Sequence, residues 1–212
     1  MALTRKKFLL AKIEATEGTD SSPVGGSNAI QISSLEITPI EADNVQAGAF
    51  QGFIGNITRG TIVANKRVSV SFDVELAGSG TAGTVPAYDP LLKACGLSVT
   101  TVANTSNTYA PVSSSFDSAT LYCFYDGTRH VITGARGTVS FNYTAGQFAV
   151  MSFQFTGVYN DPDSTALSGT FTVANQAAAL EVNDTNMTTS TFFGETSQRI
   201  ESFDFALNNN LI

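Results

Sequence analysis

The sequence has few of the residues on which enzymes and metalloproteins depend. Its 212 residues include no tryptophan, one histidine and two cysteines. His130, Cys95 and Cys123 cannot supply the three or four nitrogen and sulfur ligands of a zinc site. No GxSxG motif marks a nucleophile, and the two cysteines indicate buried thiols, with a disulfide as the alternative. We therefore expect a protein that is not an enzyme and that uses no metal or cofactor.

Basic residues are also few, and they are unevenly placed. Lysine and arginine number 11 against 18 aspartates and glutamates, which gives a net charge of −7. Residues 1–12 contain no acid and hold four of the basic residues, Arg5, Lys6, Lys7 and Lys12. The acidic remainder of the chain should repel the phosphate backbone of a nucleic acid.

Long apolar runs are absent as well. No stretch approaches the roughly 18 apolar residues that a membrane-spanning helix needs. Near the start, the apolar run FLLA at 8–11 is short, whereas a secretory signal needs about 7–15 apolar residues. We therefore expect no signal peptide and no membrane binding by this chain.

Helix signals are scarce and occur together in one segment. Asp89 can cap a helix, Pro90 suits its first turn and Gly96 can end it, so we expect one short helix at about 87–96. Elsewhere apolar and polar residues alternate. The run RVSVSFDVEL at 67–76 places valines and Phe72 on one face and serines and acids on the other, which is typical of a half-buried strand.

Turn signals separate several such runs. Asp126-Gly127 lies between two β-rich segments and predicts a hairpin, and Ala145-Gly146 predicts another turn. A further strand is expected in SFDFALN at 202–208. We therefore expect a mostly β protein, an antiparallel sandwich or barrel with one short α-helix.

The length suits one well-packed domain. We expect an N-terminal arm at 1–28 and a single β domain at 29–212. Within it, EADNVQAGAFQGFIGNIT at 41–58 is long for a hairpin connection, so we expect a loop at about 41–62. Loops of this length in compact domains are usually functional or disordered.

GSGTAG at 78–83 matches the dinucleotide-binding fingerprint GxGxxG. That fingerprint requires a buried strand before it, a helix directly after it and an acidic residue about 20 residues on. Here the preceding strand has a polar face, three residues separate the last glycine from Ala87, and no acid follows at that distance. We predict a small-residue loop that binds no nucleotide.

Several segments, in order along the chain, together resemble the tail tube proteins of long-tailed bacteriophages. They are LLAKIEATEGTD (9–20), SSLEITPIEAD (33–43), KRVSVSFDVELAGSGTAGTVPAYDPLLKACG (66–96), ITGARGTVSFNYTAG (132–146) with MSFQFTGVY (151–159), and RIESFDFALNN (199–209). The resemblance implies a structural virion protein whose subunits form hexameric rings that stack into a tube. It also implies a location in the virion tail, after synthesis in the host bacterial cytoplasm.

The same resemblance implies which partners and surfaces to expect. The chain would contact other copies of itself, a tape-measure protein and the tail-terminator and tail-tip proteins. DNA would pass through the tube without specific binding. We expect an acidic lumen lined by Glu36, Asp73, Glu75 and Asp204. We expect contacts between subunits from Arg5, Lys6, Lys7, Phe50, Phe53 and Ile54.

Two other functions fit the residues less well. A non-catalytic β-sandwich module that binds carbohydrate or protein would favour exposed aromatic side chains, and the chain has no tryptophan. Another ring-forming component of a tail or of a secretion tube would share most of the features above. Formation of rings or tubes by the purified protein would separate the assembly functions from the binding module.

Overall fold

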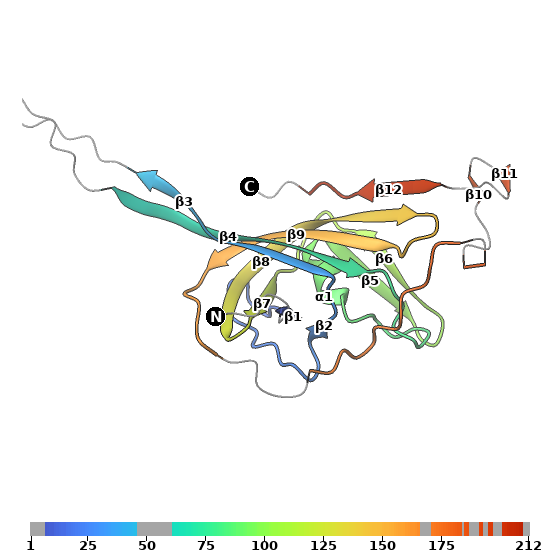
Figure 1. Cartoon of the computed structure of the whole chain (residues 1–212), viewed down its shortest axis with the longest axis horizontal. Helices are drawn as coiled ribbons and strands as arrows, with labels where there is room; N and C mark the ends of the chain where they lie inside the picture. The colour runs from blue at the N-terminus through green and yellow to red at the C-terminus, as the bar shows by residue number, and fades with distance from the viewer. Residues whose placement is uncertain are drawn as a thin grey trace, which may run out of the picture.

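A computed structural model describes residues 7–45, 61–165, 171–183, 185–186, 191–192, 195–196 and 201–209. The described chain is mostly antiparallel β-structure with one short helix, which confirms the predicted fold class (Figure 1). Its elements are β1 (Lys7–Ile13), β2 (Ala29–Ile30), β3 (Ser34–Val45), β4 (Ile62–Glu75), α1 (Asp89–Ala94), β5 (Leu97–Val102), β6 (Ser106–Pro111), β7 (Ala119–Tyr125), β8 (Thr128–Thr144), β9 (Val150–Tyr159), β10 (Thr191–Phe192), β11 (Glu195–Thr196) and β12 (Ser202–Ala206).

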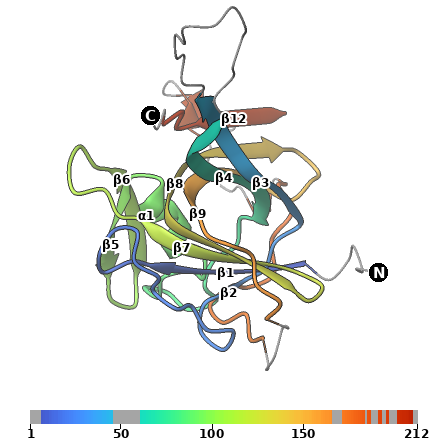
Figure 2. The same ribbon diagram turned by 90° about the vertical axis from the view of Figure 1, so that its left-hand side faces the viewer.

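One strongly bent sheet forms most of the fold. Its strand order is β2-β1-β7-β8-β9-β4-β3, and β12 pairs with β8 outside this path. The 17-residue strand β8 explains the bend, because its first part pairs with β7 and its last part with β12, while β9 runs along the other side. β1 and β2 consequently lie in a lower layer, opposite β9 and β4 (Figures 1 and 2).

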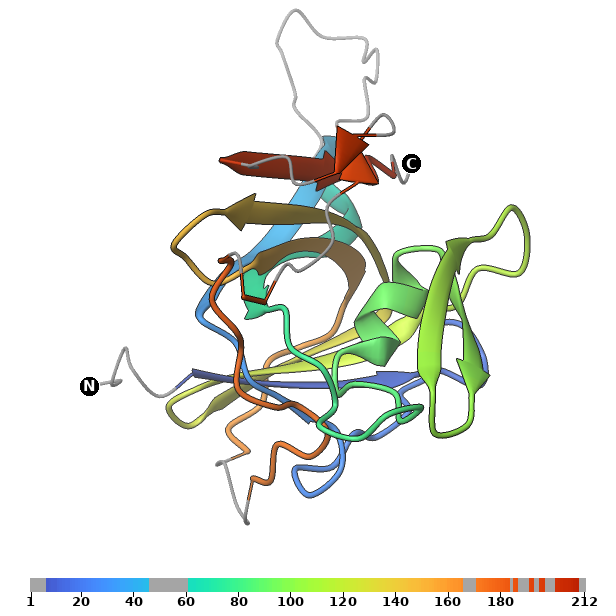
Figure 3. The same cartoon turned by 90° about the vertical axis from the view of Figure 1, so that its right-hand side faces the viewer.

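The core lies between these layers. Its largest fully buried side chains are Phe72, Phe153, Phe155, Leu9, Ile30, Leu35, Leu91, Leu121, Ile132, Met151, Val70 and Val74. Helix α1 closes one side of the core, between the β5–β6 hairpin and the large sheet (Figure 3). The cysteines Cys95 and Cys123 are free and buried, as predicted, and burial raises the pKa of the Cys123 thiol to about 12.

The alternation seen in β4 determines which face of the sheet is buried. Val68, Val70, Phe72 and Val74 are each at most 3% exposed, while the serines and acids between them are only half-buried. This confirms the predicted amphipathic strand. The two predicted turns are also present, since Asp126-Gly127 joins β7 to β8 and the residues after Thr144 join β8 to β9.

The helix is shorter than the predicted 87–96. Pro90 stands in its first turn as expected, but no side chain caps its start. The Asp89 carboxylate instead forms an ion pair with Lys93 at 2.8 Å and accepts a hydrogen bond from the Tyr109 hydroxyl at 2.8 Å. Asp89 therefore joins α1 to β6 rather than capping the helix.

Part of the predicted N-terminal arm at 1–28 forms a strand of the sheet. Lys7–Ile13 form β1, which lies between β2 and β7, and Leu9, Leu10 and Ala11 are buried. The Lys7 ammonium donates to the carbonyl oxygen of Leu35 at 2.9 Å. Lys7 thus bonds within its own chain, while the other basic arm residues, Arg5 and Lys6, lie outside the described residues.

The predicted loop at 41–62 is also shorter than expected. β3 continues to Val45 and β4 begins at Ile62, and these two residues stand opposite each other in the ladder. The paired strands form a hairpin that projects beyond the rest of the sheet (Figure 1). Phe50, Phe53 and Ile54, which we expect to contact other subunits, lie outside the described residues.

A buried carboxylate stabilises the point where β8 changes partners. Glu14 is 8% exposed and accepts hydrogen bonds from the hydroxyls of Ser118 and Thr120 and from the backbone N–H groups of Gly18 and Gly134, at 2.7–2.8 Å. Burial opposes ionisation, but these hydrogen bonds outweigh it and lower the pKa of Glu14. Gly134 has a positive φ of 61°, a conformation that glycine adopts without strain.

Candidate functional site

The four carboxylates predicted to line a lumen lie on a single face of the sheet. Residues directly opposite each other on paired antiparallel strands point to the same face. The strand registers define four cross-strand rows, Glu75–Val150–Asn142–Asp204, Ser34–Asp73–Ser152–Ser140–Ala206, Glu36–Ser71–Gln154–Thr138, and Thr38–Ser69–Thr156–Arg136. We call this surface the polar face. It lies opposite the core face, which carries Phe72 and Phe153.

The polar face is hollowed rather than flat. Two adjoining hollows of about 430 and 500 Å³ lie over β3, β4, β9 and β8. They share four lining residues, Glu36, Ser71, Thr138 and Gln154. Short hydroxyl, amide and carboxylate side chains therefore form a shallow trough, without the deep apolar pocket that is typical of a small-molecule site.

The charge of this face is negative. Arg136, the one arginine in these rows, pairs with Glu17 at 2.8 Å, and Arg67, two residues before Ser69 on β4, pairs with Glu41 at 3.0 Å. None of the four predicted lining carboxylates pairs with a base among the described residues. Asp73 accepts a hydrogen bond from the Ser34 hydroxyl at 2.7 Å, which fixes its direction without cancelling its charge.

The neutral part of this face was not predicted from the sequence. Hydroxyl and amide side chains from β8 and β9 occupy the middle of the rows, namely Thr138, Ser140, Asn142, Ser152, Gln154 and Thr156. The signal was present, because polar residues alternate with buried ones in both strands. The sequence does not show that β9 pairs with both β4 and β8, and this pairing is what brings their polar side chains together.

The GSGTAG segment does not have the geometry of a dinucleotide site. It follows β4, which pairs antiparallel with both β3 and β9, and α1 begins only at Asp89. Gly83 has a positive φ of 73°, and a Cβ there would lie 2.4 Å from the backbone nitrogen of Asn104. This glycine therefore allows the loop to pack against the β5–β6 turn. That the loop binds no nucleotide remains a prediction.

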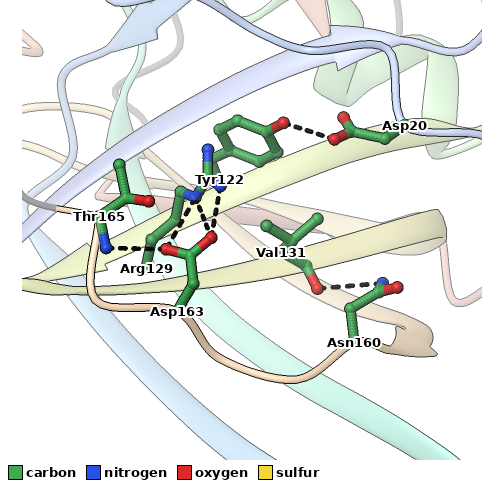
Figure 4. Close-up of polar contacts among 7 residues, drawn as sticks. All are labelled: Asp20, Tyr122, Arg129, Val131, Asn160, Asp163 and Thr165. Carbon is green, nitrogen blue, oxygen red and sulfur yellow. Dashed lines mark hydrogen bonds and ion pairs between the residues drawn. The ribbon is translucent and has the colours of Figure 1, made fainter.

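A second polar cluster joins the segment after β9 to the β7–β8 hairpin (Figure 4). Arg129 forms a two-pronged ion pair with Asp163, with Nε to Oδ2 at 3.0 Å, and its guanidinium lies 4.6 Å from the centre of the Tyr122 ring. The Tyr122 hydroxyl donates to Asp20 at 2.6 Å. Hydrogen bonds, chiefly that from Arg129, lower the pKa of Asp163 to about 2.

Every member of this cluster has a partner within the chain, so we interpret it as structural. Asp163, which stands in the motif NDPDS, bonds to Arg129 and to the backbone N–H of Thr165, as expected for a turn rather than a calcium loop. Within the described part of the chain, no group of three or more His, Cys, Asp or Glu residues could hold a metal ion.

The only histidine has a structural environment too. His130 is half-buried, and its ring is nearly perpendicular to the Tyr125 ring, with an interplanar angle of 85° and ring centres 6.0 Å apart. Burial lowers the pKa of His130, which favours its neutral form.

Among the helices that the structure describes, none is long and apolar enough to cross a membrane.

Comparisons with known proteins identify one family and several distant structural neighbours. No curated protein sequence matches the chain. Among the solved structures that are similar at a distance are two determined by cryo-EM. A cryo-EM structure of the anti-feeding prophage cap, described as a tube-terminating cap, shares 8% identity with a TM-score of 0.47, covering 78% of this chain and 92% of that one. The sheath–tube complex of an extracellular contractile injection system, in its extended state, shares 9% identity with a TM-score of 0.42, covering 75% and 88%.

These structural similarities are too distant to carry an argument about function. A family model is more informative, because the model for phage tail tube proteins matches residues 4–212. The match includes both faces of the curved sheet, the GSGTAG loop and α1. The chain therefore belongs to the phage tail tube protein family, a family of structural, non-catalytic proteins.

Proposed function

We propose that the protein forms hexameric rings that stack into the tail tube, and that the polar face lines the channel through which DNA leaves. The observation that supports this most is the continuity of the polar face. Four rows of short polar and acidic side chains cross β3, β4, β9 and β8 without an exposed base that is free to bind phosphate.

An acidic, hydroxyl-rich wall suits a channel for DNA. Adhesion to DNA needs lysine or arginine contacts that release counterions, and such contacts are absent from the described polar face. Glu36, Asp73 and Glu75 would be repeated around each ring, with Asp204 added when β12 is bound to β8. At physiological salt the screening length is about 8 Å, so the wall would repel only phosphates that pass close to it.

The remaining predicted contacts concern ring stacking and tail partners. Arg5, Lys6, Phe50, Phe53 and Ile54 are proposed to contact neighbouring subunits, and aromatic anchors commonly dominate such interfaces. The β3–β4 hairpin ends in exposed apolar residues, including Val45, Ile62 and Val63, at the point where the proposed loop begins. Tape-measure, tail-terminator and tail-tip proteins are the proposed partners of the assembled tube.

Charge reversal tests the channel. In Asp73→Lys/Glu75→Lys, tubes should still assemble, because neither side chain is in the core, but DNA ejection should fall sharply as phosphates bind the lysines. Phage particles that carry the variant would be assayed for infectivity and for DNA release in vitro. Tube formation itself would be followed by electron microscopy.

A matched control is Asp117→Lys/Glu181→Lys, which reverses two exposed acids outside the polar face. It should leave ejection unchanged. Normal ejection by the Asp73/Glu75 variant, or a tube map that places these carboxylates on the outer wall, would contradict the proposal.

A further inference from the structure

The β8 strand has two kinds of neighbour along one edge. Its first part pairs with β7, from Tyr125 opposite Thr128 to Ala119 opposite Ala135. Its last part pairs with β12, from Ser202 opposite Thr144 to Ala206 opposite Ser140. Beyond β12 the contact continues, because the backbone N–H of Leu207 donates to the carbonyl of Val139 at 3.0 Å.

β12 is bound to this edge by its backbone ladder and by two exposed aromatic contacts, and Asn209 beyond it bonds to the Thr138 hydroxyl and to the Cys95 carbonyl. All five of its residues are exposed. Phe203 and Phe205 are 47% and 50% exposed although they lie on the core side of the sheet, where their rings only tilt against Tyr143 and Phe141 at about 6 Å. No residue of β12 belongs to the core cluster, although Leu207, which directly follows the strand, packs partly buried against it. The five residues of β12 can therefore leave β8 without removing a fully buried side chain, and their release would also loosen the Leu207 contact.

The opposite end of the same sheet offers an open edge. β3 pairs only with β4 among the described strands. The carbonyl of Leu35 on β3 is occupied by Lys7 and by the Tyr125 hydroxyl, but from Glu36 to Val45 the described chain offers no second strand. Long open edges of this kind template pairing with another chain.

Strand direction makes the two edges complementary. Each step from β3 through β4 and β9 to β8 is antiparallel, so β3 and β8 run in opposite directions. A second copy related by rotation about an axis along the strands would bring its β3 antiparallel to β8. β12 is also antiparallel to β8, and it therefore occupies the place and has the direction that the incoming β3 would need.

We infer that the edge of β8 at residues 136–144 is the docking site for β3 of a second copy of this chain, and that β12 occupies it in the isolated subunit. This inference rests on the proposed function, since it concerns how the rings close. Docking would extend the polar face from one subunit to the next, because Glu36 and Thr38 of β3 and Thr138 and Ser140 of β8 point to the same face of the sheet. Asp204 would leave this face together with β12, so under this inference only Glu36, Asp73 and Glu75 of the predicted carboxylates line the assembled channel.

The exchange replaces a short ladder with a longer one. β12 covers five residues of β8, whereas the β8 edge at 136–144 has nine positions and β3 beyond Leu35 has ten residues, so a longer ladder can form and the β3 edge is no longer open. While β12 is bound, only the small fraction of subunits with a free β8 edge can assemble. The apparent affinity between copies is lowered by that fraction, so β12 would delay assembly until a growing ring displaces it.

A reversible lock tests the exchange in the full-length chain. Ser140→Cys/Ala206→Cys places two thiols directly opposite each other, within the spacing that a disulfide needs. The native Cys95 and Cys123 are fully buried and should not interfere. The oxidised variant should form no tubes, and dithiothreitol should restore assembly to the native rate, as followed by sedimentation and electron microscopy.

The control is Ser98→Cys/Ala110→Cys, an equivalent opposed pair in the β5–β6 hairpin, which should assemble at the same rate oxidised or reduced. A chain ending at residue 200 gives the converse test, and its lag before assembly should be about tenfold shorter than that of the native chain. Circular dichroism would verify that this truncated chain folds.

The outcomes separate the inference from the proposed function. Tubes formed at the native rate by the oxidised lock would overturn the inference while leaving the tube function intact. A folded truncated chain that never assembles would also overturn it, because β12 would then be part of the tube. If the native chain itself forms no rings or tubes under any condition, the proposed function fails, and the inference fails with it.

Discussion

At the scale of single residues, aromatic packing and one buried carboxylate contribute most to stability. Phe72 is 1% exposed, and its ring is 5.5 Å from Phe153 and 5.8 Å from Phe155 between ring centres. Glu14 connects the end of β1 to the start of β7 and to the bulge of β8 through four hydrogen bonds. Both residues act on the same sheet whose outer side is the polar face.

Truncation of Phe72 should be strongly destabilising. Phe72→Ala removes a fully buried ring and leaves a cavity, so we expect the free energy of unfolding to fall by about 3–5 kcal/mol. Urea denaturation of the unassembled chain would measure this change in the free energy of unfolding. Phe205→Ala, at a half-exposed ring on β12, is the control and should change stability far less. A loss below about 1 kcal/mol for Phe72→Ala would show that its ring is not buried in solution.

Replacement of Glu14 should give a pH-dependent loss. In Glu14→Gln the amide accepts fewer of the four hydrogen bonds, so we expect a loss of about 2–3 kcal/mol at pH 7. Because the pKa of Glu14 is lowered in the folded state, its contribution is complete above the unfolded pKa near 4.5 and disappears as pH falls through the folded pKa. The difference between variant and native chain should therefore shrink below about pH 4.5.

Thermal unfolding between pH 3 and 8 would measure this difference. Glu17→Gln is the matched control, since Glu17 is an exposed acid whose ion pair with Arg136 lies at the surface, and such pairs contribute about 1 kcal/mol or less. A constant difference between Glu14→Gln and the native chain across the whole pH range would contradict the role of the Glu14 charge.

At the scale of elements, the β3–β4 hairpin is the part that reaches furthest from the core. Its outer rungs, from Asp43 opposite Ala64 to Val45 opposite Ile62, carry no core side chain. Replacement of residues 46–61 by Asn-Gly would connect the facing residues Val45 and Ile62 by a two-residue hairpin turn. We expect the shortened chain to fold with native stability but not to polymerise, because the proposed contacts of Phe50, Phe53 and Ile54 are removed.

Circular dichroism and electron microscopy would test this expectation. A variant in which residues 103–104, in the β5–β6 turn, are replaced by Asn-Gly provides a control for turn replacement elsewhere. Normal tubes formed by the chain that lacks residues 46–61 would show that the loop is not needed between subunits.

At the scale of the whole molecule, one curved sheet separates two environments. Its inner side packs phenylalanines, valines and leucines against β1, β7 and α1, and its outer side presents hydroxyls and carboxylates. The two edges of the β3–β4–β9–β8 segment differ in what covers them, since no described strand pairs with β3 beyond Leu35 whereas β12 covers β8. A ring of identical subunits needs two different, complementary surfaces on each member, and these two edges are the pair that we infer to meet.

The sequence by itself determined which residues face the core and which face outward. Alternation in β4, in the second half of β8 and in β9 fixes the faces, because the side-chain period of a strand is two. Glu36, Asp73, Glu75 and Asp204 could therefore be predicted to share a solvent side before their strands were known to be neighbours.

Only the tertiary structure decided which strands are partners. KFLLAKI lies in the segment that the sequence predicts as an N-terminal arm, yet it forms β1, because Leu9 and Leu10 on its opposite faces both have apolar neighbours. The place of β12 beside Asn142 and the switch of β8 from β7 to β12 depend on contacts between residues far apart in sequence. Alternation determines the face of a strand, but pairing depends on the competition among all available edges, which no local pattern contains.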